Sequence, residues 1–179
     1  ICLISRQEGS NLLRYAHVGT GNFHEKNAKI YTDFSLFTCK KEITDEVAQV
    51  FEFIKYPYKA YTFKHLIVSP INSRDMLENL IDQEIQAAKK HEKNGITLKV
   101  NNLVDHHLIN KLYQANNAGV KIKLIIRGIC SLVTGVDNQS ENITAISIVD
   151  RFLEHPRVSI FENKGQPKVY LSSADWQLV

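Results

Sequence analysis

The sequence predicts an α/β fold in which a mixed, largely parallel sheet is flanked by helices. One observation is that residues 65–126 alternate short apolar runs with segments of helical spacing. Such a β-α-β-α-β series favours parallel strands joined by crossover helices. The other observation is a strand–turn–strand module that occurs twice, at residues 1–23 and 155–176. Each copy closes in small residues followed by Asn or Asp and an aromatic residue, and this repetition indicates two related units.

The first predicted domain covers residues 1–60 and forms the end of an α/β unit. Residues 1–37 alternate β-branched and aromatic side chains between Gly and Asn turns, which is typical of strands. A helix is expected over residues 43–54, where apolar residues keep helical spacing, with Thr44 or Asp45 as its N-cap. The polar and aromatic residues that follow are the expected linker.

The second predicted domain covers residues 61–179 and contains most of a related unit. In chain order the sequence predicts a strand at 65–70, a helix from Asn72 or Ser73 to Lys90, a strand at 96–100, a helix at 105–118, and strands at 120–126 and 143–149. Gly and Asn residues end both helices, at Asn94-Gly95 and at 117–119. The second copy of the repeated module then closes this unit.

The composition suits a folded domain without a strongly charged surface. The chain has 179 residues, 44% of them apolar, and a net charge of +3. Its lysine clusters have no interleaved aromatic residues, so no nucleic-acid partner is predicted. No apolar stretch approaches the roughly 18 residues of a transmembrane helix. Cys2, Cys39 and Cys130 lie in apolar runs, and we expect them to be buried and reduced, as in a cytosolic protein.

His155 stands at the start of the second copy of the module. Arg157 follows two residues later, and a strand then leads to Ser173-Ala174-Asp175. Folds that form a phosphohistidine use this layout: one histidine attacks phosphorus, a second protonates the leaving oxygen, and the cation holds the remaining oxygens. Because Val158 overlays on Ile1, a partner histidine is expected before Ile1. The alternative interpretation of His155 is a surface or capping histidine.

Two further side chains could contact a nucleotide. Arg127 directly follows a predicted strand, at the sheet edge where open α/β sheets bind ligands, and a guanidinium can form two hydrogen bonds to phosphate. A structural ion pair with Asp150 or Glu141 is the alternative for this arginine. Tyr31 and Asp33 share one face of a predicted strand, where Tyr31 could stack on a base or simply pack in the core.

Six segments together resemble the C-terminal half of bacterial polyphosphate kinases. They are Tyr15 to Lys26, Ile30 to Asp33, Arg127 to Cys130, Ser140 to Ile143, Phe152 to His155 and Ser172 to Trp176. That family resembles phospholipase D in fold, so the resemblance implies that both predicted domains are phospholipase D-like α/β sandwich units. Its members transfer the terminal phosphate of ATP reversibly to inorganic polyphosphate, through a phosphohistidine and with Mg²⁺.

The resemblance also implies roles for individual residues. Tyr31 matches the nucleotide-base contact of the family, and Arg127 matches a phosphate-binding arginine of the nucleotide site. His155 matches the second catalytic histidine, which also contacts the nucleotide, and Asp33 is an adjacent candidate. The histidine that becomes phosphorylated would lie just upstream of Ile1, so this chain alone is expected to be inactive. No residue of the chain is assigned to Mg²⁺.

The partners implied by the resemblance are ATP or ADP and inorganic polyphosphate, together with further copies of the same chain in a homo-oligomer. The implied location is cytoplasmic, with peripheral attachment to the inner membrane left open. Two other functions also remain open. A phospholipase D-like phosphodiesterase shares the two-histidine layout, although Arg157 stands where that superfamily usually has lysine. The other is a non-catalytic module for polyanion binding or assembly, in which the long apolar helices serve an interface.

Overall fold

The computed structural model describes residues 1–176 and divides into two compact units. The first unit consists of Ile1–Gly19 and Ser35–Arg74, and the second of Thr20–Phe34 and the residues from Asp75 onward. The early segment Thr20–Phe34 therefore packs with residues far along the chain. The expected domain limits, 1–60 and 61–179, remain a prediction, since they describe sequence domains rather than compact units.

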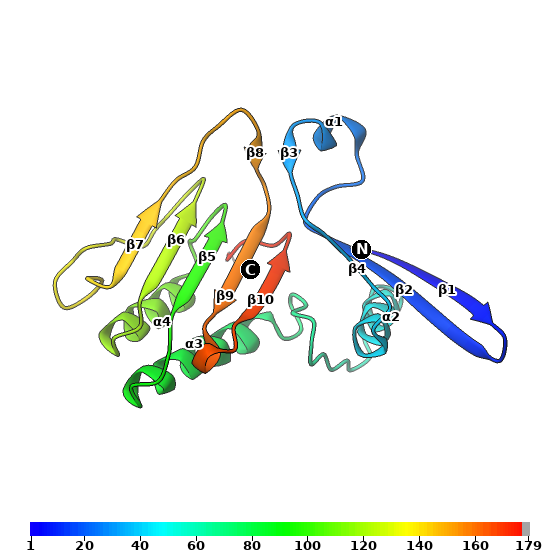
Figure 1. Cartoon of the computed structure of the whole chain (residues 1–179), viewed down its shortest axis with the longest axis horizontal. Coiled ribbons are helices and arrows are strands. Elements are labelled where there is room, and N and C mark those ends of the chain that lie inside the picture. Colours follow the sequence, from blue (N-terminus) through cyan, green and yellow to red (C-terminus); the bar gives the residue numbers. More distant parts are fainter. Residues whose placement is uncertain (177–179) are drawn as a thin grey trace. The chain divides into compact units, whose positions relative to one another are not determined.

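The first unit combines a three-stranded antiparallel sheet with one long helix (Figure 1). The sheet order is β1-β2-β4, with β1 at Cys2–Glu8, β2 at Asn11–Gly19 and β4 at Ser35–Thr38. Helix α2 spans Lys41–Lys55 and buries Thr44, Glu46 and Val47. Strands β1, β2 and β4 confirm the strands predicted at both ends of residues 1–37, and α2 confirms the helix predicted after them.

The N-cap predicted for helix α2 is wrong. The cap position is Lys40, which makes no side-chain capping hydrogen bond, and the helix begins at Lys41. Thr44 and Asp45, the expected caps, lie inside the helix. Asp45 instead accepts a 2.5 Å hydrogen bond from Arg14 Nη1 of β2. Its carboxylate therefore ties the helix to the sheet of this unit.

Residues 65–70, predicted as a strand, form an irregular segment. The buried carboxylate of Glu46 accepts hydrogen bonds of 2.8–3.0 Å from the N–H groups of residues 64–66. Asn72 Oδ1 accepts another, of 2.7 Å, from the N–H of Val68. The prediction was wrong because these side-chain acceptors take the backbone donors that a neighbouring strand would need.

The carboxylate of Glu46 makes the stability of the chain dependent on pH. Burial raises the pKa of Glu46, but hydrogen bonds from the N–H groups of residues 64–66 and from the His65 ring outweigh it, so the pKa lies below its usual value. The stabilisation is then fully present above the unfolded pKa of about 4.5, and it is lost as the pH falls through the lowered folded value.

We expect Glu46→Gln to lower the free energy of unfolding by about 1–3 kcal/mol near neutral pH, because one backbone donor loses its acceptor. Urea unfolding should show this difference shrinking as the pH falls below the unfolded pKa. Glu52→Gln, at an exposed position of the same helix, is the matched control and should change little. A Glu46→Gln loss of equal size at both ends of the pH range would contradict the assignment.

The second unit is built on a five-stranded sheet in the order β10-β9-β5-β6-β7 (Figure 1). The strands are β5 at Ile96–Val100, β6 at Ile122–Ile126, β7 at Ile143–Ile146, β9 at Arg157–Phe161 and β10 at Lys168–Ser172. β5, β6 and β7 run parallel, whereas β9 is antiparallel to β5 and β10 is antiparallel to β9. The predicted α/β class with a mixed sheet is confirmed.

Two helices cover one face of this sheet (Figure 1). They are α3 at Ser73–Lys89 and α4 at His106–Asn117, and Asp105 caps α4 through a hydrogen bond to the N–H of Leu108. Side chains alternate between the two faces of each strand. The almost fully buried set, which packs beneath the helices, is Ile96, Leu98, Val100, Ile122, Leu124, Ile126 and Phe161. The less buried set on the opposite face includes Thr97, Lys99, Ile125, Val158 and Ile160.

A two-stranded parallel ladder lies outside this sheet and was not predicted. Strand β3, Tyr31–Thr32, pairs with β8, Leu153–Glu154. The N–H of Leu153 also donates a 2.9 Å hydrogen bond to the carbonyl of Ile30. A short helix, α1 at Glu25–Ala28, precedes β3 in a stretch that was predicted as strand. This ladder brings an early segment of the chain beside the residues that precede His155.

The two copies of the repeated module form antiparallel hairpins, β1–β2 and β9–β10, as the sequence predicts. Cys2, Cys39 and Cys130 are free and exposed, so their predicted burial is wrong. Cys2 lies in β1, where alternate side chains point outward, whereas Cys39 follows β4 and Cys130 follows β6, so apolar neighbours in sequence do not place them in a core. Within residues 1–176, no helix has both the length and the hydrophobicity that crossing a bilayer requires.

Candidate functional site

The β3–β8 ladder brings three of the predicted site residues together. His155 directly follows β8, and the ring of Tyr31 lies 4.8 Å from the imidazole between ring centroids, at an interplanar angle of 39°. Asp33 Oδ1 lies 2.9 Å from His155 Nδ1. Two of these residues come from the first 40 positions and one from the last 30, so only the fold could reveal that they form one cluster.

The contact with Asp33 indicates which nitrogen of the His155 ring donates a hydrogen bond to the carboxylate. The side chains of His155 and Asp33 are 14% and 23% exposed, and Asp33 Oδ1 also accepts a 2.8 Å hydrogen bond from Thr20 Oγ1. A carboxylate can only accept hydrogen bonds, so Nδ1 carries the proton that it donates to Asp33. Nε2 of His155 is then the ring atom left for proton exchange with a substrate.

Thr20 and Gly21, in the segment Gly19-Thr20-Gly21-Asn22, pack against Asp33. Thr20 Oγ1 also accepts a 3.0 Å hydrogen bond from the N–H of Phe34. Thr20 is therefore bound both to the side chain of Asp33 and to the residue that follows it. A Cβ at Gly21 would lie 2.6 Å from Asp33 Cγ, closer than side chains approach one another. Gly21 therefore allows the carboxylate to reach His155. The sequence predicts only Gly and Asn turns in this region, so it did not reveal this contact.

Arg127 lies directly after β6, at the carboxyl end of the parallel strands, as predicted. Its Nε donates a 3.1 Å hydrogen bond to Oδ1 of Asn101, a residue that follows β5. The Nε contact is thus with a neutral amide rather than with Asp150 or Glu141, the partners expected for a purely structural ion pair. An amide orients the guanidinium without neutralising its charge.

Arg157 does not have the role expected of the cation two residues after His155. Its Nε and Nη2 donate to the two carboxylate oxygens of Asp175, at 3.0 and 3.2 Å. Its Nη1 donates to the backbone carbonyl of His155 at 2.9 Å, and both charged side chains are nearly buried. The guanidinium therefore holds the backbone at His155 and is not available to hold phosphate oxygens.

Asp175 stays charged in this arrangement. Burial raises the pKa of Asp175, but the hydrogen bonds from Arg157 and from the N–H groups of Asn101 and Asn102 outweigh it, so the pKa lies below its usual value. Asp175 Oδ1 accepts the N–H of Asn101 at 2.8 Å, and Asn101 in turn orients Arg127. This network links the positions of Arg127 and His155. The sequence singled out Asp175 only as the end of a module, and Asn101 carried no signal.

The described residues, 1–176, do not make a complete metal site. Mg²⁺ is bound in proteins by one or two carboxylates together with phosphate oxygens and water. The carboxylates near His155 are already engaged, Asp33 by His155 and Thr20 and Asp175 by Arg157. Residues 1–176 contain no group of three or more His, Cys, Asp or Glu side chains that could hold a metal ion.

Comparison with known proteins places the sequence in one family. Family models described as polyphosphate kinase C-terminal domain 1 and domain 2 match residues 1–60 and 66–178. Over 176 residues, 98% of this chain, the sequence is 61% identical to a polyphosphate kinase of Vibrio parahaemolyticus, of which it covers 25%. It is 56% identical over 174 residues to a polyphosphate kinase of Escherichia coli K12, again covering 25% of that protein.

A solved structure agrees with the fold. The crystal structure of polyphosphate kinase from Porphyromonas gingivalis superposes with a TM-score of 0.86 at 38% identity, and the match covers 96% of this chain and 28% of that chain. This likeness confirms the predicted fold class. The chain spans about a quarter of the curated relatives it matches. With both family models matched along nearly its whole length, the chain belongs to the polyphosphate kinase family.

Proposed function

We propose that this chain forms part of the site in which a polyphosphate kinase transfers the terminal phosphate of ATP reversibly to inorganic polyphosphate. The observation that carries the proposal is the cluster in which His155 contacts both Asp33 and Tyr31. An imidazole with one nitrogen held by a carboxylate and the other left for substrate is the arrangement that proton transfer to a leaving oxygen requires.

Each residue has a separate task in this proposal. Nε2 of His155 donates a proton to the leaving oxygen, and Asp33 keeps the ring in the required tautomer and stabilises the imidazolium form. Tyr31, beside this ring, stacks on the adenine base. Arg127 binds phosphate oxygens with the donors that face away from Asn101. The nucleophilic histidine, which becomes phosphorylated, lies outside this chain.

The remaining expectations belong to the complete enzyme. Mg²⁺ enters with the nucleotide phosphates, and none of its ligands is assigned to this chain. The complete enzyme is a homo-oligomer in the cytoplasm. Peripheral attachment to the inner membrane is compatible with this location. ATP or ADP and polyphosphate are its partners.

The proposal is tested in a chimera in which this chain replaces the matching 25% of the Vibrio parahaemolyticus enzyme. Asp33→Asn should lower the rate of ATP-dependent polyphosphate synthesis about a hundredfold, because an amide can donate to Nδ1 and favour the wrong tautomer. Asp150→Asn, at an exposed position, is the control and should match the unchanged chimera. Normal synthesis by the Asp33→Asn chimera would remove the His155–Asp33 pair from the reaction.

A further inference from the structure

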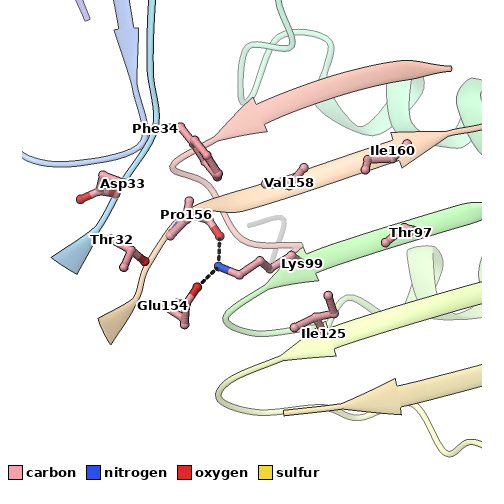
Figure 2. Close-up of a pocket in the computed structure, with 10 residues that line it drawn as sticks. All are labelled: Thr32, Asp33, Phe34, Thr97, Lys99, Ile125, Glu154, Pro156, Val158 and Ile160. Carbon is pink, nitrogen blue, oxygen red and sulfur yellow. Dashed lines mark hydrogen bonds and ion pairs between the residues drawn. The ribbon is translucent and has the colours of Figure 1, made fainter. Parts of the chain in front are cut away.

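We propose that Lys99 is a positioning residue of this reaction, which holds His155 in place through the residues on either side of it. The inference rests on the proposed function. Lys99 lies on β5, and its Nζ is 3.1 Å from Glu154 Oε2 and donates a 3.0 Å hydrogen bond to the carbonyl of Pro156. Figure 2 shows the ammonium group between these two partners, which immediately precede and follow His155.

The backbone at His155 and Pro156 is held through its carbonyl groups. Pro156 has no N–H, so it cannot be anchored by a backbone donor. Lys99 instead holds the carbonyl of Pro156, and Arg157 holds the carbonyl of His155 at 2.9 Å. Each of these cations is also paired with a carboxylate, Lys99 with Glu154 and Arg157 with Asp175. Two consecutive carbonyls are therefore fixed by two separate ion pairs.

The two ion pairs act from opposite faces of the sheet. Arg157 shares its side of β9 with the buried residues Ser159 and Phe161, beneath the helices. Lys99 lies on the other face, where Thr97, Ile125 and Val158 line a cavity of about 410 Å³ (Figure 2). A backbone segment held from one face of the sheet only could rotate about that single contact. Contacts from both faces restrict the backbone to one position, which keeps the imidazole against Asp33.

The surroundings of Lys99 favour a positioning role over binding of phosphate. The cavity wall is mainly apolar, with Phe34, Pro156 and Ile160 among its lining residues, and the lysine side chain is 17% exposed. In such surroundings an ammonium group requires a close partner, and Glu154 provides it. Because Glu154 already neutralises Lys99, the lysine is not a free cation that attracts a polyphosphate chain.

Positioning of this kind affects the rate more than substrate affinity. A displacement of about 1 Å at a reacting group can lower a rate a hundredfold. A residue that only orients His155 should change kcat while leaving the KM for ATP almost unchanged. A residue that binds substrate directly should instead raise the KM.

The test compares Lys99→Met, Lys99→Arg and Lys123→Met in the chimera described above. Lys123 lies on the same face of the neighbouring strand β6 but is exposed, so it is the matched control. Lys99→Met should lower kcat at least about tenfold with the KM for ATP within about twofold, since methionine fills the space without holding either partner. Lys99→Arg should restore most of the rate, and Lys123→Met should behave as the unchanged chimera.

Three results would overturn the inference: a kcat for Lys99→Met equal to that of Lys123→Met, a higher KM at unchanged kcat, or equal defects in Lys99→Met and Lys99→Arg.

Should Lys99→Met fail to fold, Glu154→Gln is decisive. A lower kcat at constant KM then supports the positioning role of Lys99, and an unchanged kcat overturns it. A normal Lys99→Met rate beside a defective Asp33→Asn chimera rejects only the role of Lys99, whereas normal Asp33→Asn synthesis rejects the proposed function itself.

Discussion

Replacing His155 with alanine in the chimera should lower polyphosphate synthesis about ten-thousandfold, the upper end of what a positioned acid or base contributes. The variant loses the Nε2 proton donor and leaves the carboxylate of Asp33 without its ring partner. The initial rate of ATP-dependent chain growth measures the effect. Because the imidazole contacts Tyr31 and Asp33 beside the short ladder and lies outside the apolar core of the five-stranded sheet, folding should survive, and the thermal unfolding temperature should change little.

His107→Ala is the control for this prediction, since His107 is exposed at the start of helix α4. It should retain the rate of the unchanged chimera. A His155→Ala chimera that synthesises polyphosphate at a normal rate would exclude His155 from the site, and the surface histidine considered from the sequence would be the better interpretation.

Arg127→Ala should lower kcat/KM for ATP about a thousandfold, since an arginine that stabilises a transferring phosphoryl group contributes on this scale. Arg127→Lys should recover only part of the loss, because a lysine ammonium is a point charge and cannot form the paired hydrogen bonds of a guanidinium. Steady-state kinetics over a range of ATP concentrations measures both variants.

Arg151→Ala, at an exposed position of the same unit, is the matched control and should keep its kcat/KM. If Arg127→Ala had the same kinetics as Arg151→Ala, the contact between Arg127 and Asn101 would be structural only. A full recovery by lysine would also argue against bidentate binding of phosphate.

The elements that the sequence predicted well are those with a local pattern. Helices α3 and α4 and strands β5 and β6 each show a clear apolar period between Gly or Asn stops, so their limits follow from a few neighbouring residues. The position of Arg127 at the carboxyl edge of the sheet follows from the same pattern. Local periodicity was sufficient for this part of the fold.

The errors occur where distant side chains replace the backbone as hydrogen-bond partners. The segment 65–70 is apolar enough for a strand, yet Glu46 of helix α2 accepts the N–H groups of residues 64–66. Arg157 looked like a phosphate-binding cation, yet Asp175 neutralises it. Neither partner lies within the local window that shows periodicity, so the sequence pattern could not reveal these contacts.

The candidate site itself was predicted residue by residue but not as a geometry. Motif resemblance identified Tyr31, Arg127 and His155, and the shared strand face suggested Asp33. The parallel pairing of Tyr31 with Leu153 then brings the early segment to His155. A two-residue ladder between such distant segments leaves no periodic signal. Lys99 shows the same limit, because a lysine within an apolar strand gives no indication of its partners.

In the proposed reaction His155, held by Asp33, supplies a proton while another histidine accepts the phosphate. The most direct measurement is to incubate the chimera with γ-labelled ATP, quench it in base and locate the acid-labile phosphate by mass spectrometry. We expect the labelled histidine to lie in the part contributed by the Vibrio parahaemolyticus enzyme. Phosphate on His155 itself would overturn its role as proton donor, since the ring would then be the nucleophile.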